Sequence, residues 1–565
     1  MKFFSFLVGL LLSVVWSPGA PVAVRVPVET ARRGIVVAGH PQAAAAGLAV
    51  LKAGGNAVDA AVATSLALGV AEPYASGLGG KLMLLYFDAA TGRTQAIDAL
   101  DAGGAFLTEN YLRLRPEAHD YGYSSVCVPG LPAGLWLAHQ KWGRRPWADD
   151  VQPAIALARA GYEILPKTRE QFASEERRLR GHAELKKLFL PGGELPVVGT
   201  RLKNEDLAQS LELFARGGHD AFYRGALMEK IVTAVQRRGG FLSPQAFGRY
   251  EAKLVEPIGI DFLGRRVLSV PPASDGAPLL LTVLKAFERE RFAGAPLRRP
   301  DNLDRVGRVW RAVETRVRAT TGDVAGARAA FEAMVSPAGI AEIRREAFGG
   351  PLTAKAEARA SEPVDPAVPE WAASTTHFIV VDGAGNVVCA TQSLGVHFGA
   401  GVAVPGTGIV LNNSMSNFDY TTPDAPDAPA AGKRPTSTIS PTLVLKNGRP
   451  EIALGAPGST RIPSALLQVL LDRLVLDRPL RDAIGDARVH FGSPGERGGA
   501  LAIETEDSFS PDDLRILQGM GWQVEISETA GSGRRFGGVN AVEISPRGKL
   551  TGFADPRRTN AAAGY

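Results

Sequence analysis

Hydrophobic residues near the start of the chain follow a strand pattern, then a helical pattern, then a strand pattern again. An apolar strand is expected at 34–40, Ala-rich helices at 43–52 and 57–70, and a run of β-forming residues at 82–87. Two adjacent glycines interrupt the helical spacing between residues 52 and 57 and separate the two helices. The amino-terminal part of the chain therefore predicts mixed helix and strand.

The middle of the chain is mainly helical in its pattern. Residues 147–290 alternate helical stretches with short turns, and residues 304–348 are strongly helical and rich in Arg, Ala and Glu. We interpret the charges of the second stretch as a solvated face. Residues 353–373 are rich in Ala, Pro and Glu and have no apolar period, which predicts an exposed, flexible segment.

The pattern changes abruptly after this segment. Residues 377–382 and 387–393 predict two strands joined by a glycine-rich turn. A second pair of strands is expected at 442–445 and 452–454, and a helix at 464–476. The last third of the chain is thus predicted to be antiparallel sheet with a few helices.

Composition limits the classes of protein to consider. Hydrophobic residues make up 45% and charged residues 21%, which excludes a largely disordered chain. The 64 Gly and 39 Pro follow no collagen-like period and indicate many turns. The net charge of +5 is spread along the chain, which favours a solvated surface over a nucleic-acid groove. Cys127 and Cys389 lie in apolar sequence, which favours two buried free thiols over a disulfide.

Residues 1–20 have the pattern of a secretory signal peptide. Lys2 precedes an apolar run at 3–16, and small residues up to Ala20 offer a cleavage site. The apolar run is shorter than the roughly 20 residues that cross a bilayer, and no later segment qualifies as a membrane span. We therefore predict a periplasmic or secreted protein.

Thr375, at the start of the first strand after the flexible segment, is the strongest candidate for catalysis. If the bond between Ser374 and Thr375 is cut, Thr375 carries both a hydroxyl and a free α-amine that can take the hydroxyl proton. The preceding segment supplies cleavable chain, and the turn at 455–459 offers two backbone N–H groups for an oxyanion. The chain lacks a His-Glu-x-x-His motif, a phosphate loop and a Gly-x-Ser-x-Gly elbow, so we expect no metal, no cofactor and no serine triad.

Further motifs accompany Thr375 in a characteristic order. They are Gly54–Ala61, Glu72–Gly80, Val128–Gly130, Asp220–Gly225, Thr375–His377, Gly408–Asn413, Lys433–Pro435, Ser440–Thr442, Pro457–Ser459 and Ala554–Arg558. With these motifs the chain resembles the gamma-glutamyltransferase (glutathione hydrolase) family of N-terminal nucleophile (Ntn) hydrolases. The resemblance covers nearly all of the sequence after the predicted signal.

This resemblance implies an α+β fold, the four-layer αββα sandwich of Ntn hydrolases. It also implies a precursor that cuts itself between Ser374 and Thr375. The large fragment, 21–374, and the small fragment, 375–565, would then remain together as a heterodimer within one αββα unit.

The resemblance also assigns catalytic roles. Thr375 is the nucleophile and its amine is the base, while Ser393 supplies a hydroxyl that bonds the nucleophile. The backbone N–H groups of Gly458 and Ser459 match the oxyanion site. Ser459 stands where the family has Gly, which is tolerable if its φ is negative, because only its N–H is needed.

The substrate pocket departs from the family pattern more than the catalytic centre does. Ser437 and Thr438 match the hydroxyl pair that holds the substrate α-carboxylate, but Leu100 stands where the family has an Arg. The positions that hold the α-amine carry Gly395, Ser414 and Asn417, the last in place of an Asp. Each lost charge-assisted contact is worth roughly 1.5–3 kcal/mol. Arg93 and Lys81 are the cations that could compensate.

Three functions remain open at this point. The first is an exported, autoprocessed hydrolase or acyltransferase of γ-glutamyl or related amides, small molecules or peptides, through an acyl-Thr375 ester. The second is an acylase for des-amino acyl amides, such as glutaryl amides, because the glutamate-binding residues are replaced and the segment 419–432 is a short cover. The third is an uncleaved, non-catalytic binding protein.

Overall fold

The computed structural model describes residues 24–105, 119–292, 294–350, 373–422, 424–492, 502–506, 509–527 and 536–565. The predicted signal at 1–20 and nearly all of the predicted flexible segment at 353–373 lie outside the described residues. Within the described part of the chain, no helix is both long enough and apolar enough to cross a membrane.

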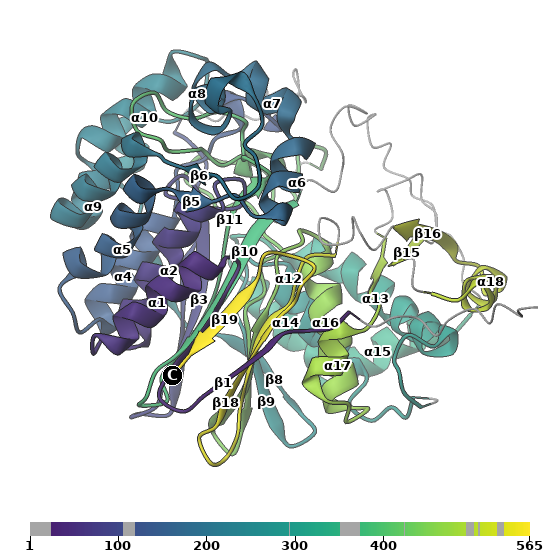
Figure 1. Cartoon of the computed structure of the whole chain (residues 1–565). Coiled ribbons are helices and arrows are strands. Elements are labelled where there is room, and N and C mark those ends of the chain that lie inside the picture. The colour runs from purple at the N-terminus through teal and green to yellow at the C-terminus, as the bar shows by residue number, and fades with distance from the viewer. Residues whose placement is uncertain are drawn as a thin grey trace, which may run out of the picture.

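Two seven-stranded antiparallel sheets pack against each other at the centre of the molecule (Figure 1). The first sheet has the order β1 (Val28–Ala31), β18 (Leu550–Ala554), β17 (Asn540–Ile544), β13 (Arg449–Gly455), β12 (Thr442–Lys446), β9 (Arg265–Ser269) and β8 (Ile258–Phe262). The second has the order β19 (Ala561–Gly564), β2 (Ile35–Ala38), β10 (Ala373–Val381), β11 (Val387–Val396), β3 (Lys81–Asp88), β4 (Arg93–Ala99) and β7 (Lys253–Val255).

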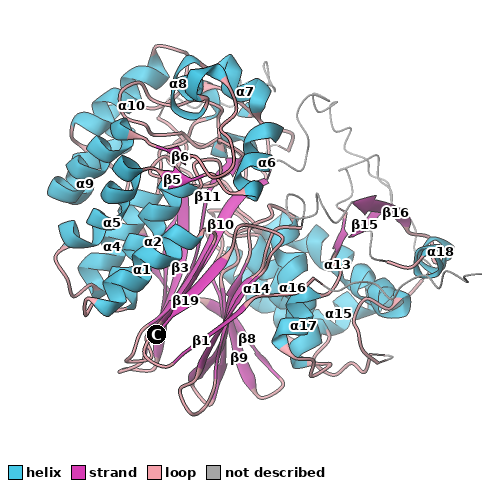
Figure 2. Cartoon of the chain, in the orientation of Figure 1, coloured by secondary structure: helices cyan, strands magenta, loops and turns pink. Residues whose placement is uncertain are grey.

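Helices cover the outer face of each sheet (Figure 2). Beside the second sheet lie α1 (Pro41–Lys52), α2 (Ala57–Ala71), α4 (Leu131–Trp142), α5 (Trp147–Ala160), α9 (Glu205–Tyr223) and α10 (Ala226–Gln236). Beside the first lie α12 (Gly276–Ala286), α13 (Pro300–Thr320), α14 (Ala327–Val335), α15 (Pro337–Phe348), α16 (Arg461–Leu474) and α17 (Leu480–Gly485). The predicted four-layer αββα fold is confirmed.

Smaller elements extend the two helical layers. They are α6 (Pro166–Ser174), α7 (Glu176–Gly181), α8 (Ala183–Phe189), α11 (Pro244–Gly248) and α18 (Pro511–Gly519), the pair β5 (Tyr162–Glu163) and β6 (Arg201–Leu202), and the sheet of β14 (Val489–Phe491), β15 (Ala502–Glu506) and β16 (Gln523–Ser527). Strands β15 and β16 are parallel, whereas every pair in the two large sheets is antiparallel.

The start of α2 follows directly from local sequence. Asn56 and Asp59 form a capping box, in which Asn56 Oδ1 accepts from the N–H of Val58 and of Asp59 at 2.9 and 3.0 Å. Asp59 Oδ2 accepts from the Asn56 N–H at 2.8 Å. Almost every residue of the Ala-rich helix is buried, which small side chains permit, because they allow close packing against the sheet.

One prediction about the elements was wrong. Residues 253–269 form strands β7, β8 and β9 at the edges of the two sheets instead of helices, because their short runs are stabilised by pairing with distant strands. The predicted helical stretch at 304–348 is confirmed and consists of three helices, α13, α14 and α15, separated by turns. The two cysteines are free and buried, as predicted.

Candidate active site

Thr375 lies at an irregularity in the pairing of β10 with β11. Ser374 pairs with Gly395 and Thr376 pairs with Gln392, so two residues of β11 face the single residue Thr375. A bulge of this kind bends the strand and redirects side chains. The strand ladder is therefore interrupted at the peptide bond between Ser374 and Thr375, and the Thr375 side chain is only 5% exposed.

Two hydroxyl groups converge on the carbonyl oxygen of Ser374. Thr375 Oγ1 donates to this oxygen at 2.7 Å, and Ser393 Oγ donates to it as well. The two hydroxyl oxygens lie 3.0 Å apart, and the N–H of Gly395 donates to Ser393 Oγ at 2.9 Å. This arrangement sets one hydroxyl group beside a carbonyl group that a second hydroxyl polarises, which is the geometry that a nucleophilic attack requires.

The motif at 72–80 supports this arrangement through hydrogen bonds to its backbone oxygens. Ser374 Oγ donates to the backbone oxygen of Tyr74, and the Leu394 N–H donates to the oxygen of Ala75 at 3.1 Å. A Cβ on Gly80 would lie 2.3 Å from the Ser393 oxygen, so only glycine fits against β11 at this point. The motif therefore supports both the bond before Thr375 and the strand that carries Ser393.

His377 is buried between the two sheets and is not placed to act as a base. Its Nδ1 lies 2.7 Å from Thr391 Oγ1, and burial lowers the pKa of the imidazole to about 3, so the ring is neutral. A Cβ on Gly455 would lie 2.2 Å from the ring. The contact brings the end of β13, and the turn that follows it, against the strand of Thr375.

The turn at Gly458 and Ser459 precedes helix α16. Gly458 has φ 141° and Ser459 has φ 51°, so the condition of a negative φ at Ser459 is not met. A non-glycine residue in the left-handed region costs roughly 1–2 kcal/mol. Two hydrogen bonds at the start of α16 offset this cost: the Arg461 N–H donates to the Gly458 oxygen and the Ile462 N–H to the Ser459 oxygen. Within the described part of the chain, the N–H groups of Gly458 and Ser459 have no acceptor, and the adjacent helix start favours negative charge.

The residues predicted for the substrate pocket are not all free to bind a ligand. Ser414 Oγ accepts from Lys81 Nζ at 3.0 Å and donates to Asp101 Oδ2 at 2.5 Å. Asn417 Nδ2 donates to the backbone oxygen of Thr436 at 2.7 Å. In contrast, no described residue hydrogen-bonds the side-chain hydroxyls of the pair at 437–438, although the backbone of Ser437 bonds residues 273 and 275.

Gly395 leaves no room for a side chain that could hold an amine. Its φ is 103°, and a Cβ would lie 1.9 Å from Asn413 Oδ1, which accepts from the Val396 N–H at 3.0 Å. The amide of Asn413 therefore occupies the space that a side chain at position 395 would need.

Gly395→Ala is expected to lower the free energy of unfolding by roughly 2–5 kcal/mol, from backbone strain and the clash together. Urea unfolding followed by circular dichroism measures this change. Gly406→Ala is the matched control, because Gly406 has φ 65° and open space around its Cβ. We expect it to cost only about 1 kcal/mol. Equal stability loss in the two variants would contradict the clash.

Of the cations near the missing Arg, only one faces the site. Leu100 is fully buried between the sheets, and Arg93 lies at the opposite end of β4, 68% exposed and 3.6 Å from Glu256. Arg434 is buried but bound to Asp98 at 2.6 Å. Arg93 is therefore excluded as a compensating residue, whereas Lys81, 2% exposed, pairs directly with Ser393.

Sequence reasoning missed the acidic residues around Lys81. Asp101 is linked to Lys81 through Ser414, and Asp275 and Asp427 lie near enough to favour its ammonium form. The sequence contains one signal of this cluster. Lys81 is a charged residue that directly precedes the apolar run at 82–87.

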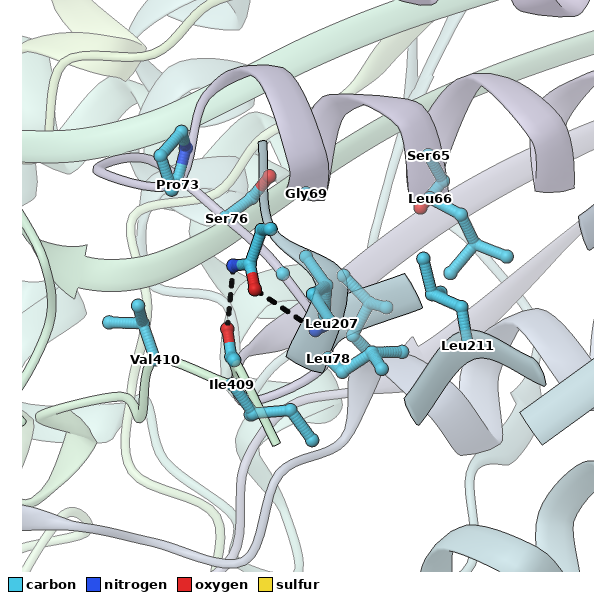
Figure 3. Close-up of a pocket in the computed structure, with 14 residues that line it drawn as sticks. Ser65, Leu66, Gly69, Pro73, Ser76, Leu78, Leu207, Leu211, Ile409 and Val410 are labelled. Carbon is cyan, nitrogen blue, oxygen red and sulfur yellow. Dashed lines mark hydrogen bonds between the residues drawn. The ribbon is translucent and has the colours of Figure 1, made fainter. Parts of the chain in front are cut away.

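Figure 3 shows a pocket on the helical side of the second sheet. Leu66 of α2, Leu207 and Leu211 of α9 and residues 408–410 line it. Gln392 points to this side, where its Nε2 donates to the Ser76 hydroxyl at 2.8 Å. Neighbouring residues of a strand face opposite sides, so β11 separates the pocket from Ser393 and Thr375.

Among the described residues, Asp59, His139 and Asp150 could together offer three ligands to a metal. Arg145 Nε donates to Asp150 at 2.9 Å, and Asp59 accepts backbone N–H groups at the start of α2. The carboxylates thus have partners, and the cluster ties α2, α4 and α5 together within the helical layer.

Comparison with known proteins relates this geometry to a family. The family model described as Gamma-glutamyltranspeptidase matches residues 43–565. The glutathione hydrolase proenzyme of Escherichia coli (strain K12) is 31% identical over 95% of this chain and 92% of its own length. The acylase ACY 1 proenzyme of Pseudomonas sp. (strain SE83) is 33% identical over 92% of each chain. The crystal structure of cephalosporin acylase from Bacillus halodurans superposes with a TM-score of 0.84, at 26% identity, over 98% of this chain and 99% of that one.

Proposed function

The chain belongs to the gamma-glutamyltranspeptidase family of enzymes, and on this premise we propose how it works. It is made as an exported precursor with a signal at residues 1–20. The precursor cuts itself between Ser374 and Thr375, and the product hydrolyses or transfers the acyl group of an amide through an ester on Thr375. The convergence of two hydroxyl groups on the Ser374 carbonyl carries this proposal.

In the proposed self-cleavage, Thr375 Oγ1 attacks the carbonyl carbon of Ser374. Ser393 donates to the oxygen that becomes negative, the C–N bond breaks, and the nitrogen takes the hydroxyl proton and leaves as the α-amine of Thr375. Water then hydrolyses the resulting ester, which releases the Ser374 carboxylate and restores the Thr375 hydroxyl. No group outside the chain other than water is required.

The two fragments, 21–374 and 375–565, are proposed to remain together after cleavage. Strand β10 of the small fragment pairs with β2 of the large fragment, and β11 pairs with β3. The core between the sheets contains residues from both fragments. Separating them would expose this apolar surface and break the strand ladders.

In the proposed turnover, the freed α-amine accepts the proton of the Thr375 hydroxyl as Oγ1 attacks the substrate carbonyl. The unpartnered N–H groups of Gly458 and Ser459 are available for the oxyanion. The amine leaving group departs with the proton, and water or an acceptor amine then releases the acyl group from Thr375.

Two acyl groups are candidates. The first is γ-glutamyl, in line with the glutathione hydrolase relatives. The second is a des-amino acyl group such as glutaryl, in line with the acylase relatives, and it is favoured by Asn417, whose amide nitrogen donates to Thr436 and brings no negative charge for an ammonium group.

Denaturing mass analysis of the purified protein, combined with hydrolysis of γ-glutamyl and glutaryl p-nitroanilides, tests the proposal. We expect two fragments, the smaller beginning at Thr375, and hydrolysis of at least one of the two anilides. The preferred anilide decides between the two acyl groups. An intact chain without hydrolytic activity would contradict both and would support a non-catalytic binding protein.

A further inference from the structure

Lys81 lies in the same row of the second sheet as the candidate nucleophile. It pairs directly with Ser393, so the two side chains share the sheet face that looks toward the first sheet. Ser393 Oγ is in turn 3.0 Å from Thr375 Oγ1. Strands β10 and β3 are two strand spacings apart, about 10 Å. A short acyl chain on Thr375 can therefore bring its far end to the Lys81 ammonium.

The Lys81 ammonium has fewer partners than its burial demands. The residue is 2% exposed, and its Nζ donates to one acceptor, Ser414 Oγ, at 3.0 Å. An ammonium group has three N–H donors. Within the described residues, Lys81 has no carboxylate within 4.0 Å and no second acceptor. Buried donors are nearly always satisfied, so this one points to a ligand that supplies the missing acceptor.

The carboxyl groups around Lys81 are only partly ionised at neutral pH. Burial lowers the pKa of Lys81, while Asp101, Cys127, Asp275 and Asp427 act in the opposite direction. Burial also raises the pKa of Asp101 to about 7, of Asp275 to about 6 and of Asp427 to about 8. It raises the pKa of the Cys127 thiol well above its ordinary value. Part of this acidic cluster is therefore protonated at neutral pH, which reduces the negative charge that an approaching anion meets.

We propose that Lys81 is the residue that selects the acyl group, by binding a carboxylate at its far end. Glutaryl and γ-glutamyl groups both carry such a carboxylate. The inference rests on the proposed acyl-Thr375 chemistry. It adds that the pocket selects acyl groups with a carboxylate at the far end.

The test compares glutaryl p-nitroanilide with pentanoyl p-nitroanilide, which has the same chain length and no carboxylate. We expect the processed wild-type protein to prefer the glutaryl substrate. In Lys81→Met, the ratio of kcat/KM for glutaryl over pentanoyl should fall by roughly 10- to 150-fold, as expected for one hydrogen bond to a charged group. An unchanged ratio in Lys81→Met, or no glutaryl preference in the wild type, would overturn the inference.

Arg93→Met is the matched control, because Arg93 lies on the adjoining strand at the exposed end of the sheet. We expect its substrate ratio to match that of the wild type. The wild-type comparison needs no variant, so the inference stays testable if Lys81→Met fails to fold. Absence of the fragment that begins at Thr375 signals failure of the proposed function, whereas a processed enzyme without carboxylate preference signals failure of the Lys81 inference alone.

Discussion

Thr375→Ala is expected to give a single uncut chain and to lower amide hydrolysis by roughly 10⁴- to 10⁶-fold, the usual effect of removing a catalytic nucleophile. The substitution removes the proposed attacking atom, Oγ1, which donates to the Ser374 carbonyl oxygen at 2.7 Å. It also prevents the release of the α-amine that would serve as the base. Denaturing mass analysis and p-nitroanilide hydrolysis measure the two effects.

Two controls define what Thr375 contributes. Thr375→Ser keeps the hydroxyl and should restore cleavage. Thr376→Ala removes the next hydroxyl, which lies beside Gly39 and Glu72 on the other side of the strand, and should still be cut. Cleavage of the Thr375→Ala chain at this bond would show that another group performs the attack.

Ser393→Ala is expected to slow both self-cleavage and turnover by roughly 10²- to 10³-fold, the effect of removing one donor from a developing oxyanion. Ser393 Oγ bonds the Ser374 carbonyl oxygen and lies 3.0 Å from Thr375 Oγ1, so its loss affects both the polarised carbonyl and the nucleophile. The rate of appearance of the small fragment after dilution from denaturant, followed by gel densitometry, measures the first effect.

Ser393→Thr should retain most of the cleavage rate, because it keeps the hydroxyl group. Thr391→Val removes the neighbouring hydroxyl on the same face of β11, which bonds His377 instead of the Ser374 carbonyl. We expect its cleavage rate to stay within a few-fold of the wild type. If Ser393→Ala were cut at the wild-type rate, the second hydroxyl would have no part in the reaction.

Features that depend on neighbouring residues were predictable. The Asn56–Asp59 capping box sets the start of α2, and the glycine-rich turn joins β10 to β11, because both rest on contacts within a few residues. The succession of motifs led to the family and hence to the αββα fold. The short strands β7–β9 were missed because pairing with distant strands, and not their own pattern, stabilises them.

The substrate pocket was the least predictable part. Arg93 and Lys81 were equal candidates to replace the missing Arg. The structure places Arg93 at the exposed end of a strand and Lys81 beside Ser393. Ser459 adopts a positive φ that its residue type disfavours, because the turn before α16 imposes it. From the sequence alone, Gly395 suggests that a ligand for the amine has been lost. The structure shows that Asn413 occupies the space that a side chain at position 395 would need.

By itself, the sequence determined the family, the candidate nucleophile and the elements whose stability is local. Only the tertiary structure decided that Ser393 bonds the Ser374 carbonyl. It also decided that three carboxyl groups, of Asp101, Asp275 and Asp427, lie near Lys81. His377 proved to be a neutral residue buried between the sheets. The physical reason is distance along the chain. These contacts join residues that are adjacent only once strands from both ends of the sequence pair, and burial then sets their charge.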